Sequence, residues 1–81
     1  MQAPEPETYT TEELGELARH LRRQAEVTQR QLGDRLGVSQ AAVSLAEKGE
    51  TGYLKVLFRI ILVLGERVVD ETPRFRVGPP L

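Results

Sequence analysis

The stretch TQRQLGDRLGVSQAAVSLAEKG, residues 28–49, decides the fold of this chain. Thr28 and Gln31 have the spacing of a capping box, which predicts a helix that begins directly after Thr28. Gly37 can adopt the left-handed conformation that closes a helix, and Ser39 is a suitable N-cap for a second helix. Two short helices joined by a tight glycine turn are the arrangement of a helix-turn-helix motif.

One further helix is expected on each side of this motif. Thr10 and Glu13 form another capping-box pattern, and apolar residues at helical spacing follow as far as Ala25. Residues 53–64 are almost entirely apolar and end at Gly65, which predicts a fourth helix. Because apolar residues surround nearly the whole of this helix and it is too short to cross a bilayer, it must pack on more than one side. One side would face its own domain and the other would need a partner.

The two ends of the chain differ from this helical region. Residues 1–9 lack periodicity and contain two prolines, so we expect a mobile tail. Residues 66–81 contain scattered apolar residues, which predicts one or two short extended segments, and the residues past Val77 are equally compatible with a frayed tail. The predicted organisation is therefore a tail over residues 1–9, a helix-turn-helix domain over residues 10–65 and an extended dimerisation segment over residues 66–81.

The composition limits the classes of protein that need to be considered. A chain of 81 residues is long enough for one domain. Without cysteine it can form no disulfide, and with a single histidine a metal site is not expected. We expect no cofactor. The acidic, proline-containing start is unlike a signal peptide or a membrane span, so a soluble cytoplasmic protein is expected.

The charge distribution permits DNA binding without indicating it. The net charge is −1, whereas proteins that bind nucleic acid usually depend on lysine and arginine. Between Arg19 and Arg59, however, eight basic residues stand against four acidic ones. From charge alone, an ordinary solvated surface is the simpler interpretation.

Residues 28–49 resemble the helix-turn-helix of the Cro/CI-type (Xre-like) family, and the similarity extends from about Leu14 to Gly65. The motifs that carry it are Thr-Gln at the start of the second helix, Leu-Gly-Val-Ser-Gln across the turn, and Glu-x-Gly and Leu-Gly at the ends of the third and fourth helices. The resemblance implies an all-α domain of four helices with a short C-terminal β segment. It also implies a sequence-specific regulator of transcription, a repressor in the simplest case, whose third helix enters the major groove of double-stranded DNA.

The resemblance places the base contacts on the outward face of the third helix. These positions are Gln40, Ala41, Ser44 and Leu45. Helical geometry independently sets them opposite Val43 and Ala46. Gln40 is the best candidate for base recognition, because a glutamine amide can both donate to and accept from adenine.

The resemblance also places a phosphate contact at Gln29, in the first turn of the second helix, and further phosphate contacts are plausible at other helix ends and on the fourth helix. The candidates are Gln29, Arg30, Ser39, Lys48 and Lys55. Gln29 would be helped by the free amides and the positive dipole of a helix start. Each basic candidate could equally be an ordinary surface charge.

Two positions depart from the family pattern. Leu45 is apolar where many relatives carry a polar base-reading residue, so specificity would depend more on DNA shape. Gly33 stands where relatives usually have alanine, which costs about 1 kcal/mol of helix propensity.

Two structural expectations follow from the resemblance and from the apolar fourth helix. Arg22 and Glu47 correspond to family positions that form a salt bridge between the first and third helices. A two-fold homodimer on palindromic DNA is also expected, since one recognition helix reads few base pairs. The predicted interface comprises Leu54, Phe58, Ile61, Leu62, Val68, Val69, Phe75 and Val77. The alternative is a monomer whose own tail folds back over the fourth helix.

A second functional class remains open at this point. Small Cro/CI-like proteins with a terminal strand resemble antitoxins, which neutralise a toxin protein and repress their own operon. The toxin-binding segment would then be residues 2–9 or the C-terminal tail. An enzyme is not expected, because His20 lies in the middle of a helix beside basic residues and the sequence has no glycine-rich phosphate loop.

Overall fold

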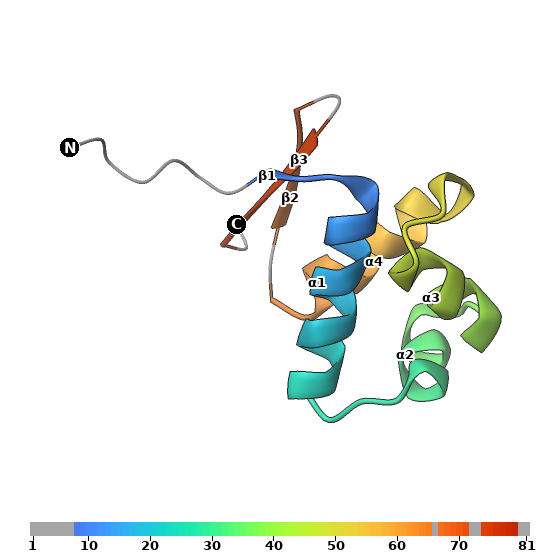
Figure 1. Ribbon diagram of the computed structural model, residues 1–81. Coiled ribbons are helices and arrows are strands. Elements are labelled where there is room, and N and C mark those ends of the chain that lie inside the picture. The colour runs from blue at the N-terminus through green and yellow to red at the C-terminus, as the bar shows by residue number, and fades with distance from the viewer. Residues whose placement is uncertain (1–7, 66, 72–73, 80–81) are drawn as a thin grey trace.

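The computed structural model describes residues 8–65, 67–71 and 74–79 of the chain. Figure 1 shows the helices packed together, with the strands lying along one side of α1 and α4. The helices are α1 (Thr11–Gln24), α2 (Gln29–Leu36), α3 (Gln40–Glu47) and α4 (Leu54–Val63), with a short 3₁₀ helix, η1 (Thr51–Tyr53), before α4. The strands are β1 (Thr8–Tyr9), β2 (Arg67–Glu71) and β3 (Arg74–Gly78). The four helices and the C-terminal β structure agree with the sequence prediction.

The first three helices begin at the predicted cap residues. The hydroxyls of Thr10 and Thr28 each accept a hydrogen bond from the amide three residues later, at 3.2 and 3.0 Å, and both capping boxes are complete. Ser39 Oγ accepts the amide of Ala42 at 3.0 Å. Gly37 closes α2 with a φ of 71°, in the left-handed region. The local sequence therefore determines where the first three helices begin, where α2 ends and how sharply the chain turns into α3.

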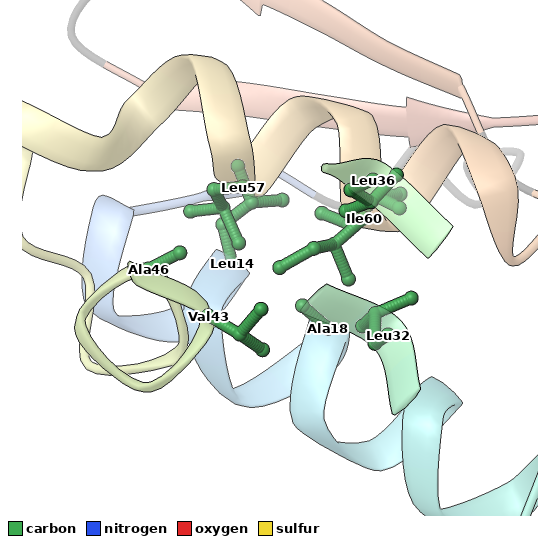
Figure 2. Close-up of a cluster of buried hydrophobic side chains, with 9 residues drawn as sticks. Leu14, Ala18, Leu32, Leu36, Val43, Ala46, Leu57 and Ile60 are labelled. Atoms are coloured by element: carbon green, nitrogen blue, oxygen red, sulfur yellow. The ribbon is translucent and has the colours of Figure 1, made fainter. Parts of the chain in front are cut away.

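The core lies between the four helices (Figure 2). Its buried members are Leu14, Ala18, Leu32, Leu36, Val43, Ala46, Leu57, Ile60 and Ile61. Full burial of each leucine, isoleucine or valine contributes about 1.5–3 kcal/mol to folding. The assignment of Ile61 to a dimer interface is wrong, because α4 packs against α1, α2 and α3 and Ile61 is completely buried in the core of its own domain.

The outer part of α4 is only partly covered by the chain itself. Leu54, Phe58 and Val77 are half-buried and pack against the core, so the C-terminal strand does fold back onto the helical domain. Leu62 and Val63, at the end of α4, remain 57% and 48% exposed. The apolar character of the fourth helix therefore serves mainly the fold, and two large apolar side chains face solvent.

The strands form an antiparallel sheet in the order β1-β3-β2. In its register Val69 lies opposite Arg76, and Tyr9 lies opposite Phe75. The predicted tail is therefore wrong at its last two residues, since Thr8–Tyr9 is strand β1. The partner of β1 lies at the other end of the chain, so no local sequence pattern could have indicated this strand.

Some predictions fall outside what the structure describes. Residues 1–7, which belong to the predicted tail and to the candidate toxin-binding segment, are among them. The side chains of Val68, Val69 and Phe75, three predicted interface positions, are also outside the description. Within the described ranges, no helix is long and apolar enough to span a membrane.

Candidate nucleic-acid interface

The outward face of α3 carries the residues predicted to contact bases. Gln40 and Ala41 in the first turn are exposed, and Ser44 and Leu45 are half-buried one turn later. On the opposite face, Val43 belongs to the core. The helix therefore presents a short surface made of one amide side chain, two small side chains and the partly covered Leu45.

An open groove runs beside this surface and is lined by α1, α2, α3 and the loop between α1 and α2. Five of the predicted DNA-contacting residues line it together, namely Gln29, Arg30, Gln40, Ser44 and Lys48. The remaining lining residues are Arg19, Arg22, Arg23, Glu26, Val27, Thr28 and Glu47. The other four predicted contacts, Ser39, Ala41, Leu45 and Lys55, are not part of the lining. Of these, Ser39 is occupied as the helix cap and Lys55 is exposed on the first turn of α4.

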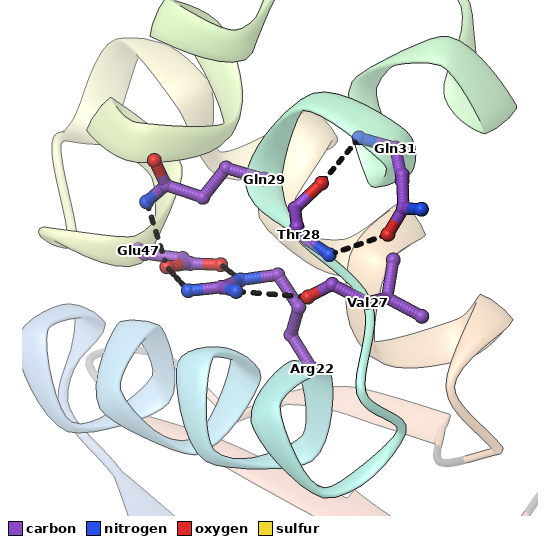
Figure 3. A network of polar contacts seen from close by, with 6 residues as sticks. All are labelled: Arg22, Val27, Thr28, Gln29, Gln31 and Glu47. Carbon is purple, nitrogen blue, oxygen red and sulfur yellow. Dashed lines mark hydrogen bonds and ion pairs between the residues drawn. The ribbon is translucent and has the colours of Figure 1, made fainter.

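The expected pair of Arg22 and Glu47 is present and is largely buried (Figure 3). Arg22 Nε donates to Glu47 Oε2 at 2.6 Å, and Nη2 donates to Oε1 at 3.2 Å. The two side chains are 10% and 3% exposed, respectively. This two-point geometry fixes orientation as well as distance, so it holds the end of α3 against α1.

Two further groups complete this polar network. Arg22 Nη1 donates to the carbonyl oxygen of Val27 at 2.9 Å, and Gln29 Nε2 donates to Glu47 Oε1 at 3.1 Å. Gln29, predicted as a phosphate contact, is half-buried and supports the Glu47 carboxylate. The sequence did not indicate this role, because residues 29 and 47 lie on different helices. The network therefore joins α1, the start of α2 and the end of α3 into one rigid unit.

Glycines allow the backbones around the groove to approach closely. A Cβ atom at Gly15 would lie 2.5 Å from the carbonyl oxygen of Glu47, so only glycine lets α1 pack this closely against α3. A Cβ at Gly33 would lie 2.7 Å from the carbonyl oxygen of Val38, in the turn before α3. The departure from the family pattern at Gly33 thus has a packing reason.

The side chains that line the groove have an excess of positive charge. Arg22 and Glu47 neutralise each other, which leaves Arg19, Arg23, Arg30 and Lys48 against the single carboxylate of Glu26. Sequence analysis did not select Arg19, Arg23 or Glu26. Glu26 also has a φ of 57°, and among the described residues it is the one non-glycine residue in the left-handed region.

One basic residue counted in the sequence has a different task. Arg59 Nη2 donates to the carbonyl oxygen of Leu36 at 2.7 Å. Leu36 is in the last turn of α2, where a carbonyl oxygen finds no amide donor within its own helix. The guanidinium group of Arg59 supplies the missing donor. Arg59 therefore ties α4 to the helix-turn-helix and does not line the groove.

A family model described as a helix-turn-helix domain matches residues 13–57, more than half of the 81-residue chain. The chain therefore belongs to this helix-turn-helix family, in agreement with its resemblance to Cro/CI-type proteins. This membership places it among DNA-binding regulators. No curated protein and no solved structure matches the chain significantly.

Proposed function

We propose that the protein is a sequence-specific regulator that binds double-stranded DNA through α3 and represses transcription. The observation that carries the proposal is the groove in which Gln40 and Ser44 of α3 lie together with Arg30 and Lys48. Specific DNA binding needs residues of both kinds, since contacts to phosphates set the position of the protein and contacts to bases supply the sequence information.

The chemistry of α3 suits the floor of a major groove. Gln40 is exposed in the first turn, where its amide oxygen can accept a hydrogen bond from N6 of adenine and its amide nitrogen can donate one to N7. Ala41 and Ser44 are small and would let the helix backbone approach the bases closely. Ala41 could also contact a thymine methyl group.

Repression requires little more than this binding. A protein bound across a promoter blocks access of the polymerase, and no enzymatic step is needed. We therefore propose repression by occlusion, with an operator that contains two half-sites.

Two half-sites would be read by a homodimer. In such a dimer the two copies of α3 would lie about 34 Å apart, on successive turns of the major groove. Leu62 and Val63 are the described apolar side chains available for the contact, since Ile61 is used in the core. Strand β2 lies at an edge of the sheet and beside α4, so its backbone could pair with the same strand of a second copy.

Selection of bound sequences from a pool of random duplexes tests the proposal. We expect an enriched inverted repeat, and transcription in vitro from a promoter overlapping that repeat should fall when the protein is added. Enrichment of no sequence, with binding equal to all duplexes, would contradict sequence-specific regulation. An enriched site without two-fold symmetry would contradict the dimer and leave specific binding intact.

A further inference from the structure

Helix α1 brings two arginines to the groove that the proposed function does not yet use. Arg19 and Arg23 are four residues apart, so they lie on the same side of α1. Both are exposed, and both line the groove together with Gln40 of α3 and with Lys48, the residue directly after α3. Neither guanidinium group has an ion-pair partner within the described part of the chain.

Arg22, the other arginine in this half of the helix, behaves differently. It is buried and donates both to Glu47 and to the carbonyl oxygen of Val27. The three arginines of α1 are thus divided into one structural residue and two exposed residues that line the groove.

We infer that Arg19 and Arg23 bind the phosphate backbone of duplex DNA, so that α1 forms one wall of the DNA interface beside α2 and α3. This inference rests on the proposed function. The Arg22–Glu47 pair fixes α1 to the end of α3, so α1 follows when α3 enters a major groove. The groove walls then meet the flanking phosphates, and guanidinium groups bind phosphate oxygens with two parallel hydrogen bonds.

A purely structural role for these arginines makes a different prediction. Arg23 lies in the last turn of α1, where a cation interacts favourably with the helix dipole. In that case alanine in place of either arginine would lower the melting temperature. The dependence of DNA binding on salt concentration would stay the same as in the wild-type protein.

The two roles are separated by the salt dependence of binding. The full chain and its Arg19→Ala, Arg23→Ala and doubly substituted variants are titrated with a non-specific duplex over a range of salt concentrations. Each lost phosphate contact should reduce the slope of log K against log[salt] by about 0.9. We therefore expect a smaller slope for each single variant and about twice the reduction for the double variant.

Matched controls identify the source of any change. Arg35→Ala removes an exposed arginine of α2 that does not line this groove, so it should leave the slope unchanged. Arg19→Lys and Arg23→Lys keep the charge and should retain most of the slope. A slope equal to that of the wild-type protein in the Arg19→Ala and Arg23→Ala variants would overturn the inference while the proposed function stands. If the wild-type protein binds no duplex at all, the proposed function fails, and this inference fails with it.

Discussion

At the scale of single residues, the proposed function assigns recognition of bases to a side chain of α3 and attachment to the DNA backbone to the residue that follows this helix. Gln40 lies at the start of the helix, and Lys48 follows its last residue, yet both line the same groove. We predict that Gln40→Ala relaxes the preference at one base pair by about 1–3 kcal/mol, because a specific amide contact is lost. Lys48→Ala should weaken binding to all sequences and flatten the salt dependence. The selected consensus of each variant measures this difference, and an unchanged consensus for Gln40→Ala would contradict the orientation proposed for α3.

Glu26 has an unfavourable backbone conformation at the edge of the same groove. Its φ of 57° is easy for glycine, whereas the left-handed region costs other residues about 1–2 kcal/mol. The amide of Val27 nevertheless donates to the carbonyl oxygen of Arg22 at 3.2 Å, which completes a helix-ending turn around Glu26.

Replacement of this residue by glycine should therefore stabilise the protein. We expect Glu26→Gly to increase the free energy of unfolding by about 0.5–1 kcal/mol, since part of the gain is offset by the greater entropy of the unfolded chain. It should also tighten DNA binding, because a carboxylate is removed from a groove with excess positive charge. Glu50→Gly is the matched control, since Glu50 has a φ of −64° and gains nothing from glycine. A decrease in stability on denaturant unfolding of Glu26→Gly would refute this interpretation of the turn.

At the scale of secondary-structure elements, the network around Glu47 fixes how the helices are arranged. We predict that Arg22→Ala lowers the free energy of unfolding by about 3–5 kcal/mol, because it leaves the carboxylate of Glu47 buried without its cation. Gln29→Ala should cost less, about 0.5–3 kcal/mol, since one hydrogen bond to that carboxylate is lost. Denaturant unfolding checks both values. If Arg22→Ala and the exposed control Arg35→Ala gave equal shifts, the pair would not hold the helices together.

The close contact at Gly33 leads to a prediction opposite to that of helix propensity. Alanine in place of glycine normally stabilises a helix by about 1 kcal/mol. At Gly33, however, the added Cβ would lie 2.7 Å from the carbonyl oxygen of Val38, so the turn before α3 would have to shift. We expect Gly33→Ala to lower the melting temperature and to weaken specific DNA binding. Gly52→Ala is the control, because its Cβ would meet no atom within 4 Å. A melting temperature of Gly33→Ala at or above that of the wild type would show that the turn adapts at no cost.

These elements differ in how far the sequence predicts them. The starts of the first three helices depend on Thr10, Thr28 and Ser39, whose side chains bond to amides only three residues away, so local patterns are sufficient. The pair of Arg22 and Glu47 was reached through the family resemblance. The hydrogen bond from Gln29 to Glu47, by contrast, joins two different helices, and a periodic pattern within one helix cannot predict it. Strand β1 was not predicted for the same reason, because it forms by pairing with β3, which lies far away in the sequence.

At the scale of the whole molecule, the structure changes the argument for association. The sequence suggested that an entire side of α4 needs a partner, but α1, α2, α3 and the C-terminal strands cover most of it. Among the side chains that the structure describes, what remains is a smaller apolar surface, formed by Leu62 and Val63 at the end of α4, the helix that lies beside the edge strand β2. A contact of this size alone would be weak, so backbone pairing between strands or binding to adjacent half-sites on DNA would have to strengthen it.

The proposed dimer is therefore best tested at Leu62. This side chain is 57% exposed, so Leu62→Glu should leave the fold intact, whereas a charge placed in an apolar contact would oppose association. We expect sedimentation to show a dimer for the wild-type chain and a shift toward monomer for Leu62→Glu. The variant should also lose more affinity for the selected inverted repeat than for a single half-site. His20→Glu, an exposed change on α1, is the control and should remain dimeric. A wild-type protein that stays monomeric at micromolar concentration and binds the inverted repeat no more tightly than one half-site would rule out the dimer.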